Sequence, residues 1–137
     1  MSEHLLINTS KIIFAVLIAL SVLQTVSAAD SDSDYKAIYP RAHDMGETSE
    51  GAAYEKVFSQ VFAKPMQSIL QDCTKDTKAP YIVNVVFVIA ADGATKRIVP
   101  APEQPVSACV AARLKSFKLP PPPKPNWMVA VNITIRE

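Results

Sequence analysis

The sequence contains few of the residues from which catalytic and phosphate-binding sites are built. Its 137 residues include three glycines, two histidines and two cysteines. Three scattered glycines do not form a glycine-rich phosphate loop. After residue 29 a single histidine remains, His43, which disfavours a Ser/His/Asp triad. Its neighbours Asp44 and Glu47 would have to bind a metal from an irregular segment. We therefore expect no enzymatic activity, no cofactor and no metal.

The net charge is also small, at +1, so no overall field would attract nucleic acid or a membrane surface. The charges are nevertheless unevenly distributed. Residues 30–55 contain seven acidic and two basic residues, whereas the chain from residue 56 onward is basic on balance. An acidic arm thus precedes a mildly basic domain. A solvated leader is the simpler interpretation, and docking of the arm on the domain or on a partner is the alternative.

The first 29 residues have the pattern of a secretory signal peptide. Lys11 precedes an apolar run from Ile12 to Val26, and the small residues Ser27, Ala28 and Ala29 follow. The run is shorter than the roughly 20 residues that cross a bilayer, which disfavours the alternative of an uncleaved anchor. Cleavage after Ala28 or Ala29 fits equally well. We expect a soluble periplasmic or secreted protein with no membrane span after signal cleavage.

Two cysteines, Cys73 and Cys109, lie in the part of the chain that would be exported. In a small exported domain such a pair most often forms a disulfide. Cys73 ends one predicted helix and Cys109 lies on the apolar face of another, so the bond would join two helices. A redox role is disfavoured because the sequence has no Cys-x-x-Cys motif. We predict a structural disulfide.

The chain after the signal divides into an arm, 30–49, and a domain, 50–137. The arm is polar, contains Pro40 and Gly46 and has no sustained periodicity, so we expect little regular structure there. The domain should begin with a helix, because apolar residues recur at three- and four-residue steps, with a kink or a new segment at Pro65. These apolar residues are Tyr54, Phe58, Val61, Phe62, Ile69 and Cys73.

Strand patterns dominate the rest of the domain. Residues 81–90 are apolar on both faces, which predicts a central strand, and the Asp92-Gly93 turn leads into a return strand over 94–99. A helix should follow Pro105, and the prolines at 120–123 should form a stiff connector. Residues 127–136 alternate strictly, as in a strand with one face on a core. The prediction is an α+β fold with a small antiparallel β-β-α-β sheet and an additional N-terminal helix joined by the disulfide.

Residues 81–137 resemble the C-terminal domain of the TonB family, closest to the variants of the AgmX/PglI C-terminal type. The matching features are the runs 85–93 and 109–117, the four prolines and the closing strand. The resemblance implies an envelope-facing, non-enzymatic domain that binds a partner by strand addition at a sheet edge. It also implies the pairing of the helix cysteine with one upstream of the first strand. The energy-coupling role of TonB itself is not expected, because it needs a retained anchor and a long proline-rich spacer.

The leading hypothesis is a periplasmic interaction module that binds an extended segment of an envelope protein at a sheet edge. A secreted or periplasmic inhibitor or immunity-type protein, acting through its proline-rich loop, is the alternative, and an accessory subunit is a third class. A sheet edge would also permit a homodimer. Trp127 is interpreted as a core lid in preference to an exposed anchor. The candidate partner-binding residues are Trp127, Met128, Ala130, Asn132 and Thr134 in the last strand, and Pro121 and Pro122 in the loop.

Overall fold

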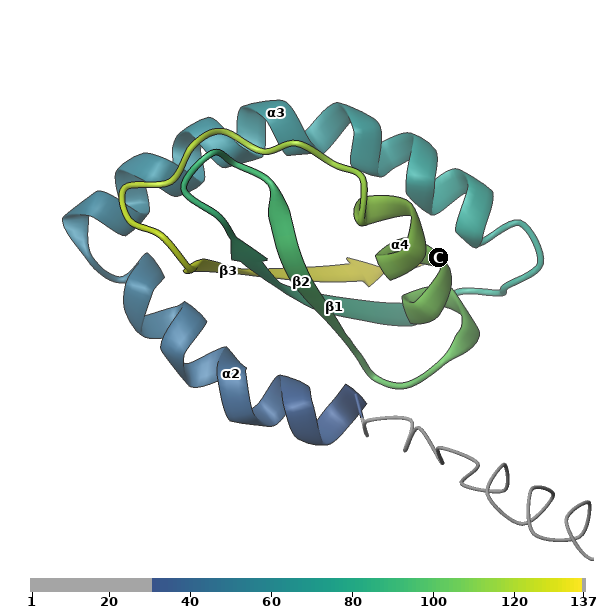
Figure 1. The fold of residues 1–137 in the computed structure, drawn as a ribbon. Helices are drawn as coiled ribbons and strands as arrows, with labels where there is room; N and C mark the ends of the chain where they lie inside the picture. The colour runs from purple at the N-terminus through teal and green to yellow at the C-terminus, as the bar shows by residue number, and fades with distance from the viewer. Residues whose placement is uncertain (1–30, 137) are drawn as a thin grey trace, which may run out of the picture.

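The computed structural model describes residues 31–136, which form three layers with the sheet in the middle (Figure 1). The predicted signal peptide, 1–29, lies outside the described residues. Helix α2 (Ser31–Gly46) covers one face of the sheet, and the helices α3 (Ser49–Cys73) and α4 (Pro105–Leu114) cover the other. The predicted α+β fold with a small antiparallel sheet is confirmed. The elements are α2 (Ser31–Gly46), α3 (Ser49–Cys73), β1 (Tyr81–Ile89), β2 (Thr95–Ala101), α4 (Pro105–Leu114) and β3 (Trp127–Ile135).

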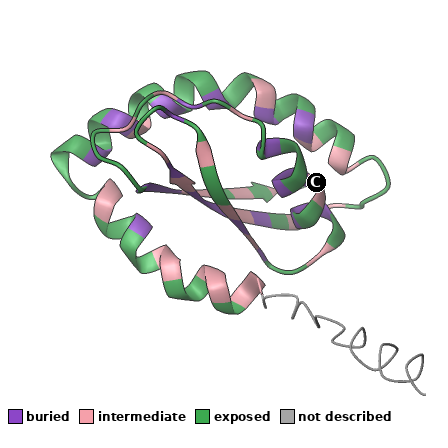
Figure 2. Cartoon of the chain, in the orientation of Figure 1, coloured by how far each residue is buried: buried purple, intermediate pink, exposed green. Residues whose placement is uncertain are grey.

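The sheet has the strand order β2-β1-β3, and both pairings are antiparallel. The middle of β1 lies at Val85, which is opposite Pro100 on β2 and Val131 on β3. Both faces of β1 are buried, as its two apolar faces predict. Val85 and Phe87 point toward α3 and α4, and Val86 points toward α2; all three are completely buried. Figure 2 shows buried residues along this central strand.

The turn between β1 and β2 needs glycine. Gly93 has φ +86°, and a Cβ built on it would lie 2.0 Å from the carbonyl oxygen of Leu119. The chain approaches this closely because the Leu119 N–H donates to the Gly93 carbonyl oxygen at 2.9 Å. Any other residue here would be strained by the positive φ, and its Cβ would collide with the Leu119 carbonyl oxygen. The turn therefore fixes the start of the proline connector against the sheet.

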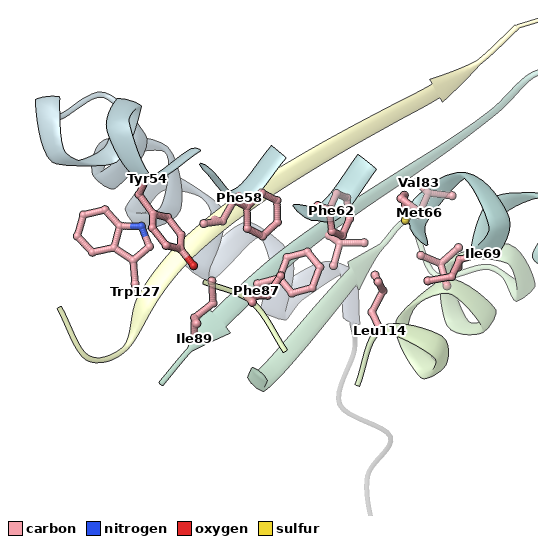
Figure 3. Packing of buried hydrophobic residues seen from close by; sticks show 14 of the residues in the cluster. Tyr54, Phe58, Phe62, Met66, Ile69, Val83, Phe87, Ile89, Leu114 and Trp127 are labelled. Atoms are coloured by element: carbon pink, nitrogen blue, oxygen red, sulfur yellow. The ribbon is translucent and has the colours of Figure 1, made fainter. Parts of the chain in front are cut away.

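Aromatic rings of α3 form the centre of the core on one face of the sheet. Phe58 and Phe62 stack with ring centroids 4.9 Å apart, and both meet Phe87 of β1 edge-on, at 5.7 and 5.6 Å. Figure 3 shows the three rings together. The helix begins at a capped end, because the Thr48 hydroxyl accepts from the Gly51 N–H at 2.9 Å. It continues without interruption through Pro65, where the sequence predicts a kink or a new segment.

The structure contains the predicted disulfide between Cys73 and Cys109, and it joins the last residue of α3 to the middle of α4. Beside it, Arg113 of α4 donates to the carboxylate of Asp72 at 2.9 Å. The disulfide thus links the two helices that cover one face of the sheet, and it lies at the end of α3 that is distant from α2. The closed loop spans 36 residues.

Helix α2 occupies most of the segment in which we expected little regular structure. Ala42, 1% exposed, packs against Val86 and Met128 on the second face of the sheet. Pro40 is exposed, so it interrupts the helix hydrogen bonding on the solvent side. Acidic residues in the first turn suit the positive end of the helix dipole. The arm therefore docks on the domain, which was the alternative to a solvated leader. The apolar positions that make this contact, at three- and four-residue steps, are Tyr35, Ile38, Tyr39, Ala42 and Met45.

Of the helices between residues 31 and 136, none combines the length and the apolar content needed to cross a bilayer.

We predict that Ala42→Glu lowers the free energy of unfolding by about 3 kcal/mol. The substitution buries a carboxylate without a partner and overfills the contact between α2 and the sheet. The matched control is Arg41→Glu, because Arg41 is the exposed neighbour on the same helix and its replacement should change stability by less than about 0.5 kcal/mol. Urea denaturation measures both. Equal stability of the two variants would show that α2 is not docked on the sheet.

We predict that Cys73→Ala combined with Cys109→Ala lowers the free energy of unfolding by about 4 kcal/mol. A closed loop of 36 residues restricts the unfolded chain by roughly that amount in the chain-entropy model. Urea denaturation of the oxidised protein, the reduced protein and the double variant measures the effect. The reduced protein should match the double variant, and a loss below about 1 kcal/mol would contradict the prediction.

Candidate partner-binding edge of the sheet

The two outer strands of the sheet differ in how open their edges are. On β2, Pro100 lacks a backbone N–H, and Lys96 and Arg97 place exposed charges along the strand. Proline and charge are the features that protect edge strands from pairing. The connector after α4 also occupies this edge, because Ala94 pairs with Lys118 and the Thr95 hydroxyl donates to the Phe117 carbonyl at 3.1 Å. The β2 edge is therefore obstructed.

The β3 edge lacks these protections. The strand runs for nine residues without proline or charge, from Trp127 to Ile135, and all nine are paired with β1 on its inner side. In an antiparallel pair, alternate residues direct their N–H and C=O groups away from the partner strand. Within residues 31–136 no further strand pairs along the outer side of β3. A row of backbone donors and acceptors is thus available there.

A groove of about 340 Å³ follows this open edge between β3 and α3. Its floor is apolar, because Phe58 and Phe62 reach it from the core and the side chains of Val129 and Val131 point toward the same helix. Ala63 lines the groove from the exposed side of α3. The remaining polar lining includes Glu55 and Ser59 of the same helix. The groove can accept apolar side chains from a chain that pairs with β3.

The first two residues of β3 belong to the interior. Trp127 is 4% exposed and meets Tyr54 of α3 edge-on, with ring centroids 6.1 Å apart, so it lies in the core as a lid (Figure 3). Met128 is 7% exposed and packs against Ala42 on the other face. Its N–H donates to the sulfur of Met45 at 3.3 Å. Neither side chain is accessible to a partner in this arrangement.

The other candidate residues of β3 lie on the α2 side of the edge. Ala130 is half-buried, and Asn132 and Thr134 are exposed. The Asn132 side-chain oxygen accepts a hydrogen bond from the Tyr35 hydroxyl at 3.2 Å. Ala130 and Asn132 also line the groove. Sequence reasoning missed Val129, Val131 and the α3 side of the groove, because periodicity alone does not show which helix flanks an edge strand.

The proline connector lies along α3 (Figure 1). The Tyr54 hydroxyl donates to the Pro120 carbonyl oxygen at 2.7 Å, and Lys124 forms an ion pair with Glu50 at 3.0 Å. Between these two contacts Pro121 is exposed and Pro122 is half-buried. The candidate loop residues are thus in a segment held at both ends against the domain.

Within residues 31–136, no group of three or more His, Cys, Asp or Glu side chains is placed so that it could hold a metal ion.

Comparison with known proteins gives no match: no family model, curated protein or solved structure matches this chain. The resemblance to the TonB family C-terminal domain therefore stays a prediction, and the function is argued from the geometry.

We predict that Tyr54 makes the protein less stable in alkaline solution. Burial raises the pKa of Tyr54 to about 12, whereas an unfolded tyrosine has a pKa of about 10. The protonated Tyr54 hydroxyl is favoured in the folded state, so the contribution of this group to the free energy of unfolding is full below pH 10 and is lost as the pH rises through about 12. In that window the free energy of unfolding should fall by up to about 1.4 kcal/mol per pH unit through this group.

The control is Tyr54→Phe, which removes both the titrating group and its hydrogen bond to Pro120. The variant should be about 1 kcal/mol less stable at pH 7 and should lose stability less steeply between pH 10 and 12. Chemical denaturation at fixed pH values measures both. Parallel profiles for the two proteins would contradict the assignment.

Proposed function

We propose that this chain is a protein–protein interaction module of the periplasm or the extracellular space. It binds an extended segment of an envelope protein, which pairs with the outer edge of β3 as a fourth strand. The observation that carries the proposal is the contrast between the two edges: Pro100 and the connector obstruct β2, whereas β3 is open beside an apolar groove.

Strand addition suits this surface on physical grounds. Main-chain hydrogen bonds to the edge supply affinity that depends little on the partner's sequence, at roughly 0.5–1.5 kcal/mol each. Side chains of the added strand that point toward α3 enter the groove and supply specificity. Phe58 and Phe62 are already fixed by packing on Phe87, so the groove is formed before a partner arrives.

Two further features support an extracytoplasmic setting. The Cys73–Cys109 disulfide is of the kind that persists in oxidising compartments. The signal-peptide pattern and the resemblance to the TonB family C-terminal domain indicate the cell envelope. In that setting, the proposed partner is an envelope protein with an extended, accessible segment.

Inhibition of an enzyme through the proline loop receives less support. Such a loop should protrude, but Pro120 and Lys124 are held against α3 and Trp127 is buried. The connector also runs along α3 instead of standing free (Figure 1). We therefore place the binding function on β3.

We predict that Ala63→Arg abolishes partner binding. Ala63 lines the groove from the exposed side of α3, so a long charged side chain should fill the groove without disturbing the core. The matched control is Ala53→Arg, because Ala53 is exposed on the same helix and does not line the groove. Affinity capture from the envelope should recover a defined protein with the control and lose it with Ala63→Arg.

Amide exchange identifies the mode of binding. The outward N–H groups of β3, apart from that of Met128, which donates to Met45, should exchange rapidly in the free protein and slowly once the captured protein is bound. Those of β2 should not change. Equal capture by both arginine variants, or new protection on β2 without protection on β3, would contradict the proposal.

A further inference from the structure

One end of the groove lies beside the corner where α2, α3 and the start of β3 converge. Residues Gly46 to Ser49 turn the chain from α2 into α3, Met45 contacts Met128, and Tyr54 packs on Trp127. From this corner α2 and α3 diverge on opposite sides of the sheet (Figure 1). A chain that pairs with β3 thus lies with one end against the corner and the other end open.

Glu55 lies at this end of the groove. Its side-chain oxygen is 2.6 Å from where a Cβ on Gly46 would be, so the carboxylate is directly against the corner. It is half-buried, and of the described residues that line the groove it alone is charged. Nearby Glu50 is paired with Lys124. Across residues 31–136, no hydrogen bond or ion pair is formed by the Glu55 carboxylate.

A half-buried carboxylate at the end of an apolar groove is complementary to a cation. A segment that filled the groove would cover Glu55 further, and the cost of removing its charge from water would be offset by an opposite charge on that segment. The lining supplies no such group, because the rest of it is apolar or neutral. The missing partner of Glu55 is therefore expected on the molecule that fills the groove.

We infer that the bound segment carries a lysine or arginine that pairs with Glu55, with apolar side chains at the second and fourth positions from it. This inference rests on the proposed function, because it assumes that the segment pairs with β3. Side chains of a strand alternate, so those that share the α3 side are two residues apart. The apolar ones would lie over Val129 and Val131, against Phe62.

The α2 side of β3 faces the intervening positions. Tyr35, Tyr39 and His43 form a row of stacked rings on α2, with centroids 5.3 and 6.1 Å apart. Tyr35 donates to Asn132 of β3, and Asp34 on the other flank of α2 pairs with Arg97 of β2, so the row follows the β3 side of the helix. Polar side chains such as threonine suit this side of the edge, because the Tyr35 hydroxyl and the Asn132 amide lie there.

The test uses four capped peptides. Two carry lysine next to alternating threonine and valine, in the orders Lys-Thr-Val-Thr-Val-Thr and Thr-Val-Thr-Val-Thr-Lys, because an edge strand can accept either direction. The other two carry glutamate in place of the lysine. Fluorescence titration of each labelled peptide measures its affinity for the wild type, for Glu55→Lys and for Glu47→Lys. Glu47 is exposed near the same corner and outside the groove, so its variant controls for net charge.

One lysine peptide should bind the wild type about tenfold more tightly than its glutamate counterpart. Glu55→Lys should reverse that preference, whereas Glu47→Lys should retain it. Equal affinity for both peptides overturns the inference but leaves the edge proposal standing. If none of the four peptides binds, the inference is overturned as well. The edge proposal is then tested separately by the capture experiment with Ala63→Arg. If the wild type is a dimer and Ala63→Arg dissociates it, the edge is occupied by a second copy of the chain. That result would also overturn the inference of a basic segment.

Discussion

The burial of both faces of β1 is the constraint on which the rest of the structure depends. A strand with valine and phenylalanine on opposite faces is stable only when each face is covered. Val85 and Phe87 require α3 and α4, and Val86 requires α2. The second requirement explains why an acidic segment with an internal proline is helical. Its few apolar side chains cover a part of the sheet that would otherwise be in contact with water.

Helix α3 combines support of the core with formation of the candidate site. Phe58 and Phe62 pack on Phe87 and at the same time form the floor of the groove. Their rings are therefore held by the packing that stabilises the protein, and the shape of the groove follows from the core. The face of the helix that is free to vary is the row of Glu55, Ser59 and Ala63 at the rim. Specificity can change there with little effect on stability.

Much of the fold, and less of the site, could be predicted from the sequence. Strict alternation in β3, apolar residues on both faces of β1 and the Asp92-Gly93 turn are local patterns, and they predicted the strands correctly. The arm was mispredicted because Pro40 and Gly46 obscured a weak apolar stripe that tertiary packing stabilises. The groove depends on the rotation of α3 relative to β3, and no spacing within either element encodes it. The interpretation of Trp127 as a core lid was correct, whereas the burial of Met128 depends on α2, a segment for which we expected little regular structure.

The proline in β2 has a consequence for the stoichiometry of assembly. A sheet that is open on both sides can grow without limit, because each added strand presents a new edge. Here Pro100 and the Ala94–Lys118 bridge terminate the sheet on one side. Within the described residues, strand addition is thus restricted to the β3 side of the sheet. Two copies that met edge to edge at β3 would leave only their obstructed β2 edges outermost, so that contact would close on itself instead of propagating.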